Sequence, residues 1–403
     1  MLTVLAFDPV GGHGGNYVYD LAFLRALARC DVRVIWTTCD ETPIHSDPEV
    51  ETWRPFRGIY GSAPAALRGL RFALGLLALL LRARRLSKSG PVIIHQQFVT
   101  VPFLERQFVV LARLLSIPRV LTVHDVMPFA RKRLRSERQL TSLYRRYDGL
   151  IVHSNAAALE LQAMIAATGL DTPPIHIIPH GHYNNSYVDA DLPRSLARQR
   201  LGISAEKRMV LFLGQVKRDK GLDILLEAFA KAVNEVPDAA LVIAGRSFHD
   251  SPLRYEALAD KLGIREKLTF RWEYVPDEEL AVYYRAADVV ALPYRRVYQS
   301  GVCLTAYAFR RAVVATAVGG LREQVVDGTT GVLVAPGDPD AFSAALVTLL
   351  RNRHCDDMGN AGHQWAAERC DWDIVASETV AAYSTALKFP VLPGLPRTRV
   401  GDQ

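Results

Sequence analysis

A short polar loop in the second half of the chain carries three basic side chains, Lys217, Arg218 and Lys220, and ends at Gly221. The apolar run Val210–Leu213 before the loop is short enough for one buried strand. After the loop, apolar residues recur at helical spacing, at Leu222, Leu225, Leu226 and Phe229. The amino end of such a helix presents unpaired N–H groups, and added lysine and arginine donors favour a phosphate or diphosphate there. The alternative is an ordinary strand–helix loop with solvated charges.

A histidine in the first half stands in a second position suited to chemistry. His124, with Asp125, follows the strand expected over Arg119–Val123, and ligands of open α/β sheets lie beyond the carboxyl ends of the strands. A histidine there can donate a hydrogen bond to a ligand or polarise a leaving group. A structural histidine bonded to the backbone is the alternative. His180 and His182 show no third ligand in the sequence, so we expect a loop and no metal site there.

Four glycines, Gly11, Gly12, Gly14 and Gly15, follow the first expected strand. Glycine has no Cβ, so the backbone here can come close to a ligand or to a neighbouring chain. The pattern lacks the third glycine of a dinucleotide-binding fingerprint at the required spacing, which argues against a nicotinamide-dependent oxidoreductase.

Length and cysteine content set the broad class of the protein. A chain of 403 residues is too long for one compact core, so we expect two domains. The five cysteines are scattered and form no CxxC pair, which predicts neither a disulfide framework nor a zinc site and fits a reducing, cytoplasmic compartment. The amino terminus leads directly into a strand pattern, so we expect no signal peptide.

Basic residues are concentrated in the first half of the chain. The segment 54–146 holds 18 Lys and Arg against three acidic residues, a net charge of +15, whereas residues 191–403 are neutral overall. Such a local basic field indicates an anionic partner. We do not expect nucleic acid, and an anionic membrane surface is a candidate.

The run Phe72–Leu81, FALGLLALLL, holds ten residues without a charge, whereas a membrane-spanning helix needs ~20. Basic residues flank the run, at Arg68, Arg71, Arg82, Arg84, Arg85 and Lys88. One interpretation is a helix in the membrane interface, with its arginines on lipid phosphates. The other is a buried helix of the domain with solvated ends.

Short apolar runs that predict strands alternate with helical segments in both halves, as between the strands expected over Lys267–Arg271 and Asp288–Leu292. Such alternation predicts an α/β fold with doubly wound parallel sheets. We therefore expect two Rossmann-like domains, over 1–188 and 207–370, with a polar linker over 189–206. An interdomain cleft is the expected ligand site.

Together these motifs resemble the GT-B glycosyltransferases of the retaining family 4 type, also called glycosyl transferases group 1. The resemblance is strongest over 208–350, where the chain reads LFLGQVKRDKGLDILLEAF, VPDEELAVYYRAADVVALPY and VATAVGGLREQVVDGTTGVLVAPGDPDAF. In the first half, TVHDV, LIVHSN and IIPHGHY occupy the positions expected of the first domain and the hinge. The segment 371–390 resembles the helix that crosses back to the first domain, and 391–403 is a tail.

The resemblance implies a nucleotide-diphosphate-sugar donor held mainly by the second domain. Lys220, with Lys217 or Arg218, would hold the diphosphate, and Arg271–Val275 would line the base pocket. His124 is the implied catalytic residue and would act on the sugar. The implied donor-binding residues are Gly12, Gly14, Lys217, Arg218, Lys220, Tyr274, Val275, Ser300, Gly301 and Thr305. No metal and no other cofactor are expected, because the basic residues would neutralise the leaving diphosphate.

The chain departs from the family pattern at positions that recognise the ribose and the transferred sugar. Gln215 stands where the family usually has an arginine after the loop glycine. Of the family's paired glutamates, the second aligns with Thr305, and the first falls near Val297–Gln299, which contains no acid.

The function implied by the resemblance is that of a retaining hexosyltransferase, which moves a sugar from the donor to an acceptor hydroxyl. A front-side mechanism, in which the diphosphate assists the incoming hydroxyl, is implied for the family. The expected acceptor is a lipid-linked or membrane glycan in cell-surface polysaccharide or glycolipid synthesis. The expected location is cytoplasmic or peripheral on the inner face of the cell membrane. The alternative, given the missing glutamates, is a catalytically silent protein that binds a sugar nucleotide.

Overall fold

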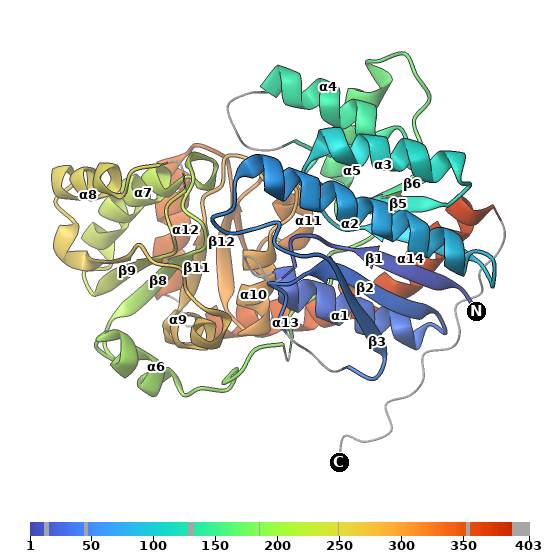
Figure 1. The fold of residues 1–403 in the computed structure, drawn as a ribbon. Coiled ribbons are helices and arrows are strands. Elements are labelled where there is room, and N and C mark those ends of the chain that lie inside the picture. The colour runs from blue at the N-terminus through green and yellow to red at the C-terminus, as the bar shows by residue number, and fades with distance from the viewer. Residues whose placement is uncertain are drawn as a thin grey trace. The chain divides into compact units, whose positions relative to one another are not determined.

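The computed structural model describes residues 1–11, 16–43, 47–127, 133–184, 186–248, 250–351 and 355–388 (Figure 1). The chain forms two compact units, one of Met1–Gly181 with Asp371–Gln403 and one of His182–Cys370. Each unit is built on one parallel sheet, which confirms the predicted α/β fold with two Rossmann-like domains.

The sheet of the first unit has seven strands in the order β3-β2-β1-β4-β5-β6-β7. The strands are β1 (Thr3–Phe7), β2 (Arg33–Cys39), β3 (Val50–Phe56), β4 (Val92–Gln96), β5 (Arg119–Thr122), β6 (Gly149–Val152) and β7 (Ile175–Ile177). From β1 the chain moves outward to β2 and β3 and then returns to β4 on the other side of β1. This reversal creates a switch point between β1 and β4, where loops diverge and a crevice forms.

Helices cover both faces of the first sheet. They are α1 (Asn16–Arg29), α2 (Ala65–Leu86), α3 (Pro102–Leu114), α4 (Arg133–Tyr144), α5 (Asn155–Ala166) and α14 (Trp372–Leu387). Because parallel crossovers are right-handed, the reversal at β4 places α2, α3, α4 and α5 on the face opposite α1. The helix α14 packs against α1, and Arg29 of α1 pairs with Asp373 of α14.

The sheet of the second unit has six strands in the order β10-β9-β8-β11-β12-β13. The strands are β8 (Arg208–Leu213), β9 (Ala239–Ala244), β10 (Leu268–Arg271), β11 (Val289–Leu292), β12 (Ala312–Thr316) and β13 (Gly331–Val334). The chain leaves β8 toward β9 and β10 and then returns to β11 on the other side of β8, so the second switch point lies between β8 and β11.

The second unit contains eight described α-helices and several short 3₁₀ turns. The helices are α6 (Arg194–Leu201), α7 (Leu222–Glu235), α8 (Pro252–Lys261), α9 (Leu280–Ala286), α10 (Gly301–Ala308), α11 (Leu321–Gln324), α12 (Pro339–Arg351) and α13 (Cys355–Arg369). Fully buried apolar side chains of α7 and α12, including Phe229 and Phe342, pack with the strands β8 and β9 into one core. This core holds the strand ends in place.

The structure differs from the expected linker over 189–206, because this segment contains α6 and belongs to the second unit. The polar sequence of α6 is explained by its contacts. The buried Arg198 pairs with Asp288 at 2.7 Å and donates hydrogen bonds to the carbonyls of Ala286 and Ala205 at 3.1 and 2.6 Å. Arginine contacts of this kind hold α6 in place although it has no apolar stripe. A prediction from hydrophobic periodicity therefore does not find this helix.

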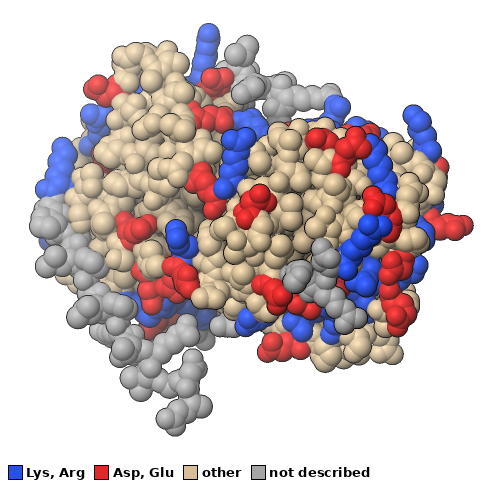
Figure 2. Space-filling view, turned by 180° about the vertical axis from the view of Figure 1, so that it is seen from behind, with Lys and Arg blue, Asp and Glu red and all other residues tan. Residues whose placement is uncertain are grey.

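Charges of both signs are interspersed on the face of the molecule shown in Figure 2. Within the described ranges, none of the helices combines the length and the apolar character that a membrane span needs.

Candidate functional site

In the second unit, the two loops at the switch point carry four of the residues that the sequence indicated, and α10, which follows the second loop, carries Gly301 and Thr305. The loop after β8 contains Lys217, Arg218 and Lys220, and the loop after β11 ends at Ser300. Because β8 and β11 are neighbouring parallel strands, their carboxyl ends open at the same edge of the sheet. The fold therefore brings the basic loop beside the amino end of α10.

The basic loop has a defined backbone. Arg218–Lys220 forms a single 3₁₀ turn. Gly221, whose φ is +66°, follows this turn and directly precedes α7. A Cβ on Gly221 would lie 1.9 Å from the carbonyl oxygen of Pro293, so only glycine allows the two loops to approach this closely. Among the described residues no side-chain cap is formed by Gly221 at the amino end of α7, and Asp223 accepts a hydrogen bond from its own backbone N–H. The other N–H groups at such a helix end favour an anion.

The lysines of this loop lie against aromatic rings. The Lys220 ammonium is 3.7 Å from the ring centroid of Tyr294, and the Lys217 ammonium is 5.1 Å from that of Phe248. Cation–π contacts of this kind hold the charge near the loop while leaving it able to meet an anion. Arg218 is exposed.

Arg295 joins the two loops and was not predicted. Its guanidinium pairs with the Asp223 carboxylate at 2.7 and 3.0 Å and donates to the carbonyl of Arg218 at 2.9 Å. Its backbone N–H donates to the carbonyl of Asp219 at 2.8 Å. Burial opposes the charged form of Asp223, but the hydrogen bond and the charge of Arg295 outweigh it and lower the pKa of Asp223. Nothing in the sequence near Arg295 indicates this role.

Ser300 caps α10, because its Oγ accepts a hydrogen bond from Cys303 N at 3.2 Å. The backbone N–H of Ser300 donates to Gln324 Oε1 at 2.9 Å. Gly301 is the first residue of α10. The candidates Ser300 and Gly301 thus lie at a helix amino end beside the basic loop.

Thr305, which stands in place of the family's second glutamate, is buried and already bonded within the protein. Its hydroxyl donates to the carbonyl of Gly301 at 2.9 Å and lies 3.1 Å from the Tyr187 hydroxyl. Tyr274 and Val275 follow β10, an edge strand two positions from β8. Tyr274 is exposed and Val275 is buried, so a base pocket at this edge would use the Tyr274 ring.

In the first unit, the described part of the loop after β1 is held by the carboxylate of Asp8. The buried Asp8 accepts hydrogen bonds from Val10 N at 2.9 Å and Gly11 N at 2.7 Å. Burial, and then the charge and hydrogen bond of Asp8, raise the pKa of the neighbouring Asp20 well above its usual range. The candidates Gly12 and Gly14 lie outside the described residues.

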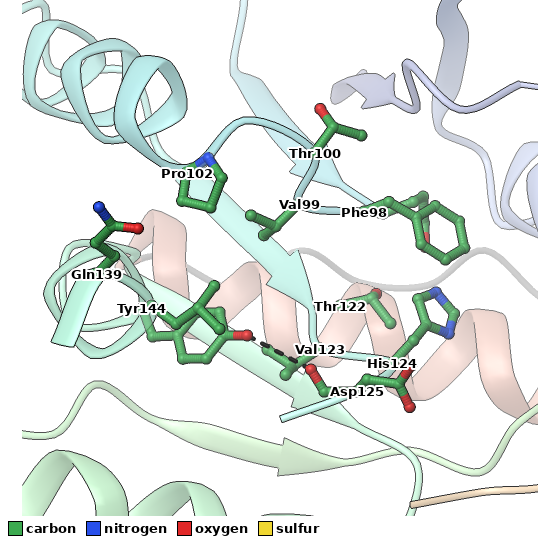
Figure 3. Close-up of a pocket in the computed structure, with 12 residues that line it drawn as sticks. Phe98, Val99, Thr100, Pro102, Thr122, Val123, His124, Asp125, Gln139 and Tyr144 are labelled. Carbon is green, nitrogen blue, oxygen red and sulfur yellow. Dashed lines mark hydrogen bonds between the residues drawn. The ribbon is translucent and has the colours of Figure 1, made fainter. Parts of the chain in front are cut away.

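His124 lies where the sequence placed it, directly beyond the carboxyl end of β5 (Figure 3). Its ring stacks on Phe98, from the loop after β4, with the ring centroids 4.4 Å apart. Burial, and then the nearby His153 and His180, lower the pKa of His124 well below its usual range, so the ring is neutral. Within the described structure its Nε2 has no hydrogen-bond partner, and a shielded ring nitrogen without a protein partner is free for a ligand.

Three further histidines surround this position, the buried His95 and His180 and the half-buried His153, and each makes at least one hydrogen bond. His95 contacts the hydroxyls of Tyr383 at 2.6 Å and Thr122 at 2.8 Å, while His153 and His180 contact backbone carbonyls at 2.9 and 2.8 Å. Burial is the main cause that lowers the pKa of His95 and His180 to about 3 and the pKa of His153 to about 4. Both ring nitrogens of His95 have hydroxyl partners, whereas the Nε2 of His153, like that of His124, lacks a partner in the described structure. No group of three or more His, Cys, Asp or Glu side chains placed to hold a metal occurs among the residues that the structure describes.

A cavity of about 340 Å³ lies beside His124 in the first unit (Figure 3). Its lining comes from the loops after β4 and β5 and from α4, and includes the polar residues Thr100, Asp125 and Gln139. Both amide atoms of the buried Gln97, which also lines it, lack partners in the described structure. The Tyr144 hydroxyl donates to the carbonyl of Val126 at 3.2 Å and so ties α4 to the loop after β5. The sequence did not predict this cavity, because its walls come from segments far apart in the chain.

Comparisons with known proteins agree with the fold. Residues 10–182 match the model of glycosyltransferase family 4, and residues 193–365 match that of glycosyl transferases group 1. Sucrose-phosphate synthase from Thermosynechococcus elongatus is 22% identical with a TM-score of 0.74, over 96% of this chain and 99% of that one. The Anabaena protein HepE, solved with UDP-glucose, is 17% identical with a TM-score of 0.70, over 95% of this chain and 99% of that one.

Curated relatives are named D-inositol 3-phosphate glycosyltransferases. The one from Xylanimonas cellulosilytica is 35% identical over 57% of this chain and 55% of its own length, and the one from Segniliparus rotundus is 31% identical over 68% and 62%. The chain thus covers less than two thirds of the length of these relatives. A third, from Kribbella flavida, is 27% identical over 93% of this chain and 92% of its own length. With a family 4 domain in its first half and a group 1 domain in its second, the chain belongs to the glycosyltransferases of GT-B fold.

Proposed function

We propose that the protein transfers a hexose from a nucleotide-diphosphate sugar to an acceptor hydroxyl, with retention of anomeric configuration. The observation that carries this proposal is the second switch point, where a basic loop and two helix amino ends converge. Backbone N–H groups of α7 and α10 would bind the diphosphate together with Lys217 and Lys220. Similar structures solved with UDP and with UDP-glucose support a donor of this class.

The leaving diphosphate would gain negative charge in the transition state, and fixed positive groups that meet this charge lower the barrier. Lys220 is placed for this role at the start of α7. His124, held neutral by its surroundings, would donate or accept a hydrogen bond at a sugar hydroxyl through Nε2. No protein nucleophile is assigned, so a front-side reaction in which the diphosphate assists the incoming hydroxyl is proposed for retention.

The acceptor is proposed to enter the first unit through the cavity beside His124. Thr100, Asp125 and Gln139 line that cavity and offer hydrogen bonds to hydroxyl groups. We expected a lipid-linked or membrane glycan, whereas the curated relatives are named for a small phosphorylated polyol. Both classes therefore belong among the acceptors to be tested.

A second candidate, a catalytically silent protein that binds sugar nucleotides, is favoured by one observation. Thr305 replaces a glutamate, and its hydroxyl is already bonded to Gly301 and Tyr187. Such a group adds no charge for binding donor hydroxyls.

The test is an assay of nucleoside diphosphate release from UDP-, GDP- and ADP-hexoses, with D-inositol 3-phosphate and lipid-linked glycans as acceptors. NMR spectroscopy of the product would give the anomeric configuration. Release that depends on an acceptor, with retention, is the expected result. Tight donor binding without release for any acceptor would favour the silent protein, and no donor binding would contradict both candidates.

A further inference from the structure

The helix α2 has two apolar faces, and one of them is exposed. Phe72, Leu76, Leu79 and Leu80 are at most 4% exposed and pack in the domain core. On the other side, five leucines are 40–62% exposed: Leu67, Leu70, Leu74, Leu77 and Leu81. Their spacing of three and four residues keeps them in one stripe along the helix. The run Phe72–Leu81 is therefore a buried domain helix that also presents leucines outward.

The neighbouring helix α3 extends this exposed apolar surface. Phe103 is 63% exposed, Leu111 48% and Leu114 76%. Both helices lie on the same face of the first sheet and contact each other, and Figure 1 shows them side by side in the first unit. The exposed leucines of α2 and these three residues define the α2–α3 face. Exposed apolar residues gathered on two neighbouring helices are typical of an interaction site.

The charges around the α2–α3 face are almost all positive. The helix α2 carries five arginines and no acidic residue, and Arg84, Arg85 and Lys88 at its carboxyl end are exposed. On α3, Arg106 and Arg113 are exposed. The acidic residue of α3, Glu105, is buried and accepts hydrogen bonds from backbone N–H groups at its amino end. By contrast, the side of the molecule in Figure 2 shows both signs interspersed.

We propose that the α2–α3 face docks on an anionic lipid bilayer. The leucine stripe would enter the boundary between headgroups and acyl chains, and the basic side chains would meet lipid phosphates, as interfacial amphipathic helices do. Arginine suits this position, because its aliphatic stem lies along apolar surface while the guanidinium reaches the headgroups. The inference does not depend on the donor site, which lies in the other unit.

A second copy of the chain is the other occupant that a leucine stripe at this spacing could accept. Charge argues against it. Two copies of this face would bring together the exposed basic side chains Arg84 and Arg85 of α2 and Arg106 and Arg113 of α3, with no exposed acidic residue on either helix, and like charges in contact oppose association. An anionic bilayer supplies the opposite charge instead.

The first experiment is co-sedimentation of the full chain with vesicles of phosphatidylcholine alone or mixed with phosphatidylglycerol. We expect pelleting with the mixed vesicles only. The variant Leu70→Gln/Leu74→Gln/Leu77→Gln should bind at least tenfold more weakly, whereas Leu196→Gln/Leu253→Gln, at exposed leucines of the second unit, should bind like the wild type. All five positions are exposed, so the variants should fold, and circular dichroism with donor binding checks this.

The second experiment separates charge from apolar insertion. Replacing Arg84, Arg85 and Lys88 by Gln should remove the part of binding that salt weakens, because such attraction decays over a Debye length of about 8 Å at physiological ionic strength. Arg200→Gln/Lys261→Gln is the control, at exposed basic residues of the second unit. Absence of pelleting with mixed vesicles at low salt would overturn the proposal. So would a wild-type dimer that the leucine variant converts to monomers, which would assign the face to a second copy.

Discussion

The guanidinium of Arg295, which follows β11, lies 2.7 Å from the carboxylate of Asp223 at the start of α7. The same side chain donates a hydrogen bond to the carbonyl of Arg218 at 2.9 Å. It therefore fastens the loop after β11 to the basic loop after β8. Because Arg295 is exposed, the pair contributes only about 1 kcal/mol or less to global stability, and its main effect is on the position of the lysines.

Arg295→Ala should weaken binding of a nucleoside diphosphate about tenfold, because the basic loop loses its tie to the neighbouring loop. Isothermal titration calorimetry measures this effect. Arg254→Ala is a matched control, since Arg254 also contacts Asp223, at 3.3 Å. The control should bind like the wild type. Equal affinity of the Arg295 variant and the control would show that the tie does not position the site.

Lys220→Ala should also weaken nucleotide binding at least tenfold while the fold stays intact. A charge-assisted hydrogen bond of the kind expected from Lys220 to a diphosphate contributes ~1.5–3 kcal/mol. Lys231→Ala, on the exposed side of α7, is the control for loss of a lysine in the same element. Calorimetry that finds unchanged affinity for the Lys220 variant would remove this residue from the site.

His124→Ala should lower turnover by roughly a hundredfold or more, in the range found when a hydrogen-bond donor to the reacting group is removed. Affinity for the nucleoside diphosphate should change little, because His124 is assigned to the sugar. Steady-state kinetics and calorimetry on one preparation separate these effects. A fall in nucleotide affinity as large as the fall in turnover would contradict the assigned role.

The sequence predicted the elements that have strong apolar patterns. The apolar runs Val210–Leu213 and Phe72–Leu81 lie within β8 (Arg208–Leu213) and α2 (Ala65–Leu86). The strand β3, with the sequence VETWRPF, was missed because an edge strand tolerates charged residues and a proline. The helix α13 was missed because its polar residues hide the apolar period, and its small residues pack closely: a Cβ on Gly362 would meet the Tyr307 ring at 2.3 Å.

The candidate site was predicted only where its signal is local. Lys220 stands out because basic residues precede a helix, and His124 because it ends a strand. Arg295 and Gln97 carry no such signal, since one depends on a carboxylate more than 70 positions away and the other on a cavity built from separate segments. Contacts of this kind follow from the packing of the sheet and not from neighbouring residues.

Acidification should destabilise the first unit. His95, His153 and His180 have folded-state pKa values of about 3, 4 and 3, whereas unfolded histidine titrates near 6.5. The pKa of His124 is also lowered well below its usual range by burial, so it is a fourth site of this kind. Below about pH 6.5 the unfolded state therefore binds more protons than the folded state at all four histidines, and stability decreases as the pH falls. Glu105, whose pKa burial raises to about 7, and Asp20 act in the opposite sense with one proton each. Four histidines outnumber the two carboxyl groups, so the net effect is a loss of stability as the pH falls.

Hydrogen–deuterium exchange of the β1 and β4 amides at about pH 7 and pH 5 measures this effect in the first unit alone. Exchange rates must be corrected for the pH dependence of the chemical step. His153→Gln removes one titrating group, so its pH dependence should be smaller by about one proton. Protection that is equal or greater at the lower pH would refute the expected balance.

Gly221→Ala should destabilise the second unit and weaken nucleotide binding, and a second glycine separates the two causes. Gly221 has φ of +66°, and a Cβ there would lie 1.9 Å from the carbonyl oxygen of Pro293. Gly202 has almost the same φ, +69°, but nothing in the described structure lies within 4 Å of its Cβ position. An alanine at Gly202 therefore adds only left-handed backbone strain, about 1–2 kcal/mol.

At Gly221 the contact with Pro293 must also be relieved, which moves the basic loop away from the loop after β11. We expect the Gly221 variant to lose more stability than Gly202→Ala in urea unfolding, and to be the one of the two that loses nucleotide affinity. Equal losses of stability and equal nucleotide affinities in the two variants would contradict this prediction. The protein could then relax around the added methyl group without cost to binding, and the close approach of the two loops would not be needed for the site.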